Sequence, residues 1–356
     1  MITEKTAFAI DAVGTPMIMA RSTIFTVLLY LTASGIILPA SYGNPLSASG
    51  EATQLELLQK INTIRATVDS IRFEMGKPRV APIEIRASDV EPRELYYLAY
   101  SLLRKTNRLT TEVLNRRYPE TSASLHRDYD VEDVSHLLNT AQQRMGDICR
   151  SLDISNSSIE AKLAESSFSE SSLTQFNAAD SHAAPVRAVT LHEAEFFALI
   201  QANRELNDLL HRELAPEDVF EIVTTALSYS TILRSEFPGY AMPETPPFQR
   251  GKRPVDVYKK LLSCMNHVRS IAQTRNLHLL ELTVAPTALE VIEPEDVSEI
   301  ASLLVAELAG LHAQLEGTKA PYRVFFPGIK LPSHVYQRAA LLERQLIELL
   351  NLYEDG

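Results

Sequence analysis

Two stretches between apolar helical segments combine basic and aromatic side chains, at positions 237–253 and 321–331. Helix connections in bundles usually take about 2 to 8 residues, and longer structured loops often carry function. Cations beside aromatic rings attract anionic groups while the rings supply contact area, so these loops suit an anionic partner. The candidate bases are Arg250, Lys252, Arg253, Arg323 and Lys330, and the candidate apolar anchors are Phe325 and Phe326.

We expect equivalent loops of an up-down helical array to gather at one end and to form a shared binding surface. The competing interpretation, which the packing tendency of aromatic side chains favours, is that the aromatic residues, Phe237 and Phe248 among them, close the ends of the hydrophobic core and leave the bases in water. Tyr258 and Tyr336 follow the valine of a repeated phrase that is described below. A shared packing role is favoured for both tyrosines, with ligand contact as the alternative.

No residue pattern indicates catalysis or a metal site. The chain lacks the nucleophile-elbow, phosphate-loop, dinucleotide and haem-attachment signatures. Asp208 and His211 lie three residues apart, as in di-iron bundles, but the second Glu-x-x-His of such a site is missing. The sequence therefore favours a protein that is not an enzyme, and it implies no cofactor and no metal.

A phrase recurs at nearly constant spacing and opens a run of apolar residues each time. Its clear copies are 216–219, 254–257, 294–297 and 332–335, with prolines 38, 40 and 38 residues apart, and its weaker copies are 92–95 and 131–134. Proline suits the first helical position, where its missing N–H costs nothing. Acidic residues at the next positions complement the positive end of the helix dipole. We interpret the phrase as a helix start, although Ser333 and His334 replace the acids in the last copy.

Apolar residues at steps of three and four predict about eight long amphipathic helices, each about 30 Å long. Glycine is scarce, and strand signals are confined to 279–284 and 322–326, so the sequence predicts an all-α fold. The preferred arrangement is two four-helix units, 52–212 and 214–353. The alternative is one continuous helical-repeat solenoid with a period of about 39 residues.

Three regions follow the amino-terminal leader in this prediction. They are an N-terminal helical region at 52–152, a Ser-rich flexible linker at 153–188 and a C-terminal helical-repeat region at 189–353. The two cysteines, Cys149 and Cys264, occupy different positions along their predicted helices. Two buried thiols are therefore favoured over a disulfide, which remains the alternative.

Composition narrows the class of partner. With 34 Lys and Arg against 45 Asp and Glu, the net charge of −11 excludes a general nucleic-acid binder, which needs clustered bases. The sequence favours a binding or scaffold protein for an unknown protein or anionic ligand. The alternative is a small-molecule receptor or enzyme with a cavity inside a helix bundle. The predicted buried faces are almost entirely apolar; a buried polar cluster at a cavity would favour this alternative.

The amino terminus resembles a secretory leader. Positions 22–50 hold no charged residue, follow Arg21 and end in small residues near Gly43. This pattern predicts a signal peptide at 1–43, with Met17 or Met19 as a more usual start. The expected location is the periplasm or the exterior. The alternatives are a single-pass membrane anchor and a buried core helix. We expect contact with a membrane only if this segment is such an anchor.

Export makes a direct prediction about the mature chain. We expect cleavage after Gly43, because small residues at Ser41 and Gly43 match the positions that signal peptidases require. Amino-terminal sequencing of protein recovered from the expressing cells should begin at Asn44. A chain that is recovered intact in the membrane fraction would contradict cleavage and would indicate an anchor.

Overall fold

The structure is a computed structural model. Every residue that it describes belongs to one compact unit, Leu46–Gly356. The structure describes residues 48–79, 85–119, 129–170, 190–211, 214–237, 239, 243–284, 289, 292–315, 321 and 327–355. The segment predicted as a signal peptide, 1–43, lies outside these ranges. Within them, no helix combines the length and the apolar character that crossing a bilayer requires.

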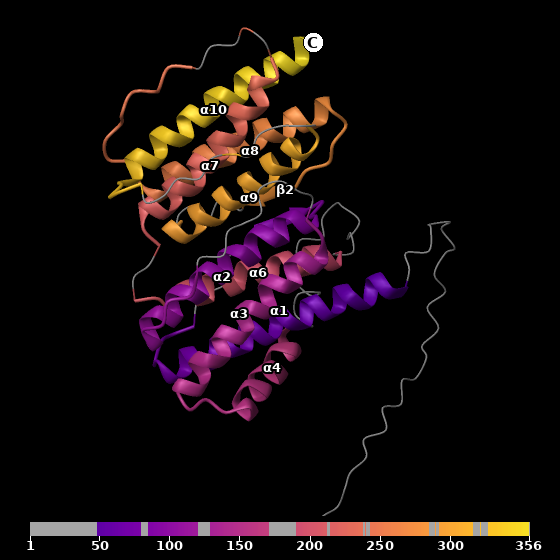
Figure 1. The fold of residues 1–356 in the computed structure, drawn as a ribbon, viewed down its shortest axis with the longest axis vertical. Coiled ribbons are helices and arrows are strands. Elements are labelled where there is room, and N and C mark those ends of the chain that lie inside the picture. Colours follow the sequence, from indigo (N-terminus) through magenta and orange to yellow (C-terminus); the bar gives the residue numbers. More distant parts are fainter. Residues whose placement is uncertain are drawn as a thin grey trace, which may run out of the picture. The chain divides into compact units, whose positions relative to one another are not determined.

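The predicted all-α class is confirmed: long helices make up most of the described chain (Figure 1). A first group of four packs side by side, namely α1 (Ala48–Glu74), α2 (Pro92–Leu114), α3 (Val131–Ser151) and α6 (Leu191–Asn207). A second group consists of α7 (Pro216–Ser235), α8 (Pro254–Thr274), α9 (Pro294–Ala313) and α10 (Pro332–Asp355). In each group the first and second helices lie diagonally opposite, as do the third and fourth.

Two short strands join the groups. β1 (Ile85–Ser88) pairs antiparallel with β2 (Glu281–Val284), with Ile85 opposite Val284. The sequence indicated the second strand, whereas the first was not predicted. The other strand signal, at 322–326, falls outside the described residues.

Each repeated phrase begins a helix, and the structure shows why its third residue matters. In the copies of α7, α8 and α9, the carboxylate of that residue accepts the backbone N–H of the residue before the proline, at 3.0, 2.8 and 2.8 Å. This bond satisfies one of the donors that a helix start leaves unpaired. In the last copy His334 does the same, because its Nδ1 accepts the Leu331 N–H at 3.0 Å.

Helices within a group run parallel, so the expected up-down arrangement is wrong. Contacts between α7 and α10 advance together along both helices. In order they are Phe220 with Arg338, Ser230 with Gln345 and Phe237 with Tyr353. The same direction holds for α8 against α10, where Lys260 meets Glu343 and Arg275 meets Tyr353. In the first group α2 is parallel to α3, since Tyr96 near the start of α2 stacks on Tyr129, and Asn107 further along α2 accepts a hydrogen bond from Arg144 of α3.

Parallel helices explain the long connections. A chain that leaves the far end of a 30 Å helix must return along its whole length before the next parallel helix begins. The connection 236–253 shows this return along α10. Its residues Glu244, Pro246 and Lys252 bond to Arg344, Gln337 and Ser333, in descending order along that helix.

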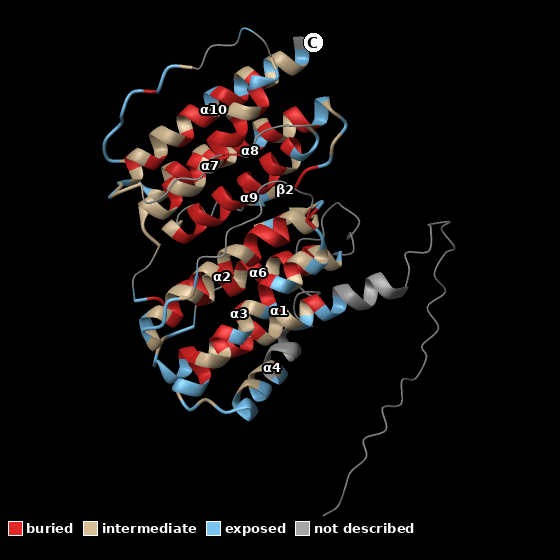
Figure 2. Cartoon of the chain, viewed as in Figure 1, coloured by how far each residue is buried: buried red, intermediate tan, exposed pale blue. Residues whose placement is uncertain are grey.

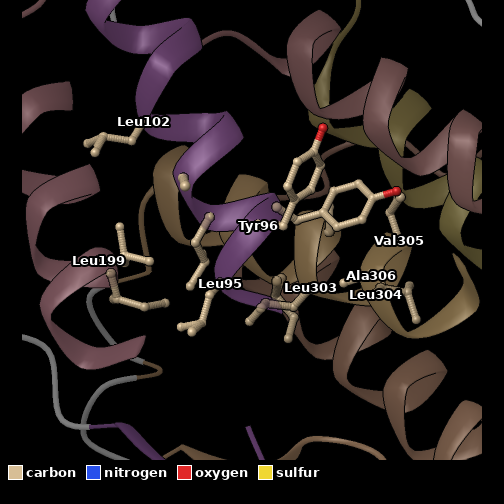
Figure 3. Close-up of a cluster of buried hydrophobic side chains, with 14 of the residues drawn as sticks. Leu95, Tyr96, Leu102, Leu199, Leu303, Leu304, Val305 and Ala306 are labelled. Atoms are coloured by element: carbon tan, nitrogen blue, oxygen red, sulfur yellow. The ribbon is translucent and has the colours of Figure 1, made fainter. Parts of the chain in front are cut away.

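The two groups meet where α2 lies antiparallel against α9 (Figure 1). Arg93 near the start of α2 contacts Glu307, and Lys105 further on contacts Glu295. Between these ion pairs lies an apolar layer from α2, α6 and α9, of which Figure 3 labels Leu95, Tyr96, Leu102, Leu199, Leu303, Leu304, Val305 and Ala306. As a result α9 is buried along almost its whole length (Figure 2).

Part of the segment predicted as a flexible linker is helical. Residues Asn156–Glu170 form α4, which packs against α1. Near this contact Lys162 lies 4.0 Å from the Asp69 carboxylate. Residues 171–188 of the segment fall outside the described residues.

Candidate functional site

The candidate site is the surface formed by residues 246–253 and 327–338, which we call the basic–apolar surface. These segments precede or begin α8 and α10, and the parallel arrangement brings both helix starts to the same end of the second group. The two segments hold five bases and no carboxylate, in a chain where acids outnumber bases. The bases are Arg250, Lys252, Arg253, Lys330 and Arg338.

Aromatic rings hold three of these bases in place. The Lys252 Nζ lies 4.1 Å from the centre of the Tyr336 ring. Lys330 and Arg338 both lie over the Phe220 ring of α7, at 4.9 and 4.8 Å. Such cation–π contacts fix the long side chains while their charges stay near water. Arg250 and Arg253 are exposed.

Large apolar side chains are exposed among the bases. Ile329 is 87% exposed, Leu331 is 56% exposed and Phe248 is 42% exposed. The Phe248 ring lies 4.9 Å from the ring of His334, whose Nδ1 accepts the Leu331 N–H, so Phe248 and Leu331 are neighbours. Phe248 therefore does not close the core. Phe237 does pack inward, 5.0 Å from the ring of Tyr353.

The other residues proposed from the sequence lie elsewhere or outside the described part. Tyr258 is buried and lies against Asp296 and Glu299 of α9. It therefore differs from Tyr336, although both follow the valine of the phrase. Arg323, Phe325 and Phe326 fall outside the described residues.

A second polar constellation lies inside the protein, so the expectation of almost entirely apolar buried faces is wrong. The Lys105 ammonium is 2% exposed, contacts the Glu295 carboxylate and donates to Asn203 Oδ1 at 2.8 Å. At the next residue of each helix, Arg204 of α6 pairs with Asp296 of α9. Glu299 completes this buried charged cluster on the same face of α9.

Burial dominates the electrostatics of this cluster. It raises the pKa of the Glu299 carboxyl well above the ordinary value, and repulsion from Glu295 raises that pKa further. Burial also raises the pKa values of Glu295 and Asp296, while Lys105 and Arg204 respectively oppose the rise. Glu299 is thus the member that favours the neutral form most strongly.

The cluster borders only a small cavity. Its volume of about 10 Å³ accommodates roughly one water molecule. The lining residues are Ile85, Ile200, Tyr258, Leu282, Asp296, Glu299, Ile300 and Leu303. The buried polar residues therefore meet one requirement of a receptor or enzyme, whereas the space for a substrate is missing at this cavity.

Neither a metal cluster nor a reactive thiol emerges from the described ranges. Within them no three His, Cys, Asp or Glu side chains converge as a metal site requires. Cys149 of α3 and Cys264 of α8 are separate buried thiols. Burial raises the pKa of Cys149 to about 11, which keeps its thiol protonated and unreactive at neutral pH.

Two sequence signals would have revealed the buried charged cluster, which the sequence analysis missed. Lys105 falls at helical spacing among Leu98, Leu102 and Leu109, which places a cation on the buried face of α2. Glu295 and Glu299 are like charges four residues apart, an arrangement that is unfavourable on a solvated helix. The basic–apolar surface is marked by the complete absence of acids from 246–253 and 327–338.

Comparison of the chain with protein-family models, with curated proteins and with solved structures finds no match.

The buried pair makes a prediction about stability. We expect Lys105→Met to lower the free energy of unfolding by about 3 to 5 kcal/mol, because it leaves a buried carboxylate without its cation. Chemical denaturation measures the loss. Arg150→Met, which removes the pair of the exposed Arg150 with Asp147 on α3, should cost less than about 1 kcal/mol. Equal losses in the two variants would contradict the assigned role of Lys105.

Glu299 makes a prediction about pH. Because its pKa is higher in the folded than in the unfolded chain, the folded state holds an extra proton above the ordinary value of 4.5. Its contribution to stability is therefore present at low pH and is lost as the pH rises through the folded pKa.

Between the pKa of Glu299 in the unfolded chain and its higher pKa in the folded chain, the difference in unfolding free energy between wild type and Glu299→Gln should change by up to about 1.4 kcal/mol per pH unit. Wild type should lose stability with rising pH relative to the variant. Denaturation midpoints from pH 5 upward, measured side by side at constant ionic strength, test the sign. Parallel pH profiles for the two proteins would show that Glu299 has no raised pKa.

Proposed function

We propose that this protein is an exported helical scaffold that binds an anionic partner through the basic–apolar surface. The observation that carries the proposal is the exposure of Ile329, Leu331 and Phe248 among five bases. Single exposed apolar residues are ordinary, but an apolar group rimmed by charges of one sign is typical of an interaction site.

The contacts at this surface support a preformed site. Lys252 and Lys330 are already held over Tyr336 and Phe220, so binding has less side-chain freedom to restrict. Arg250 and Arg253 remain exposed and are free to reach an anionic group. The bases supply attraction and orientation, while the apolar residues supply area that is removed from water on binding.

The start of α10 adds to the local positive charge. Ser333 and His334 stand where the other clear copies of the phrase carry at least one acid, so the first turn has no carboxylate. The partial positive charge of the helix end is therefore not compensated there. This supports an anionic partner over a cationic one, despite the negative charge of the whole chain.

A photo-crosslinking experiment tests the proposal. A photoreactive residue at exposed position Gln249 should form a specific adduct in the cells or medium where the protein occurs. The same residue at exposed Gln143 on α3 provides a matched control position in the first group. Adducts that form from position 249 and not from 143 support binding at the basic–apolar surface.

A charge variant completes the test. Changing Arg250, Lys252, Arg253 and Lys330 to Gln should preserve helicity, since surface substitutions usually cost under about 0.5 kcal/mol each. The adduct yield at position 249 should fall, and high salt should lower it in wild type, because exposed charges are screened. If the adduct yield at position 249 is the same in the variant as in wild type and does not change with salt, the proposed function is overturned.

A further inference from the structure

We propose that the anionic partner of the basic–apolar surface is the headgroup region of a lipid bilayer, into which Ile329, Leu331 and Phe248 insert. This inference rests on the proposed function and names its partner. It differs from an anchor by a membrane-spanning helix, because the contact comes from two loops of the folded unit.

The first reason is the shape of the apolar group. A protein partner is usually bound where its anchor residues fill desolvated pockets. Here the apolar residues project outward instead, and the Ile329 residue is 87% exposed to solvent. A side chain that projects so far finds few partner atoms on a flat protein surface, whereas a fluid bilayer interface surrounds it on all sides.

The second reason is how tightly the loops are turned. Gly328 adopts φ +71° and Gly251 adopts φ +76°, the left-handed region that glycine enters without strain. These glycines turn the chain just before Ile329 and just before Lys252. The first turn therefore presents the exposed Ile329, and the second is bonded back to the fold, because the Lys252 N–H donates to Ser333 Oγ at 3.2 Å.

The third reason is the order of charges around the apolar group. Lys330 lies between Ile329 and Leu331, and Arg250 lies two residues after Phe248. When apolar side chains enter the interface, bases next to them reach the phosphates of anionic lipids. Aromatic and aliphatic residues flanked by Lys and Arg are the composition of interfacial anchors.

The experiment is vesicle binding by the full chain and by the chain from Asn44, which retains the whole compact unit Leu46–Gly356. Vesicles contain either phosphatidylcholine alone or one part in three of phosphatidylglycerol. We expect both chains to co-sediment with the anionic vesicles at least about fivefold more than with the neutral ones. Binding by the shorter chain shows that the leader is not responsible.

Two variants separate apolar insertion from charge. Ile329→Ser/Leu331→Ser should lower the partition onto anionic vesicles at least about tenfold, because it removes two side chains that would leave water. The variant with Arg250, Lys252, Arg253 and Lys330 changed to Gln should bind anionic vesicles more weakly by a similar factor, and its remaining binding should not depend on salt.

Matched controls lie in the first group. Leu55 and Phe73 of α1 are 52% and 73% exposed, so Leu55→Ser/Phe73→Ser removes comparable apolar area elsewhere. Arg116 and Arg117 are exposed, and their change to Gln removes surface charge away from the loops. Both control variants should bind vesicles as wild type does.

The outcomes distinguish this inference from the proposed function. If no form binds anionic vesicles while position 249 still crosslinks to a protein in a charge-dependent way, the partner is an acidic protein and the lipid inference is overturned. If vesicles bind every variant equally, the surface is not the lipid contact and the inference is again overturned. If neither vesicles nor crosslinking depends on these residues, the proposed function fails as well.

Discussion

Charges that are buried between the two helix groups must be paired, and this requirement governs how α2 and α9 meet. Among the described residues, each ion pair that joins the groups has its cation on the first group and its carboxylate on the second. These pairs are Arg93–Glu307, Arg104–Glu221, Lys105–Glu295, Arg108–Asp218 and Arg204–Asp296. A shift of α2 along α9 by one helical turn would separate buried partners. The apolar layer of Figure 3 supplies contact area, while the ion pairs select one register and one direction.

The basic–apolar surface depends on the direction of the helices within a group. Because α7, α8 and α10 run parallel, their starts lie at one end, together with the last residues of two returning connections. In an up-down array these connections would have been short turns at alternating ends. Long returning connections instead bring Phe248 beside His334 and Lys330 over Phe220. The spacing of about 39 residues between copies of the phrase thus corresponds to one helix of about 20 residues and one returning connection of similar length.

The helix starts could be predicted to the residue because Pro-x-Asp-Val encodes local chemistry: a proline that needs no donor and a carboxylate that reaches back three residues. Helix direction could not be predicted, since an amphipathic face has the same spacing whichever way its neighbour runs. For the site, the sequence marked Lys252 and Lys330 as candidates by their charge among aromatic residues, and the structure places Lys252 over Tyr336 and Lys330 over Phe220. Exposure was not predictable, because Phe248 and Phe237 belong to the same loop and only the fold turns one outward and the other inward.

Two copies of the phrase show how one local structure serves opposite electrostatic environments. In α9 the acids of the phrase are retained, and Asp296 caps the helix start while it also pairs with buried Arg204. In α10 the His334 ring replaces the capping carboxylate, and its Nδ1 makes the equivalent bond at 3.0 Å. The substitution therefore keeps the hydrogen bond that begins the helix and removes the negative charge beside it. Helix formation alone does not require that removal, since Asp218, Asp256 and Asp296 cap equally well. At this one start a carboxylate would neutralise the neighbouring Lys330 and Lys252, whereas a histidine makes the same hydrogen bond without adding negative charge.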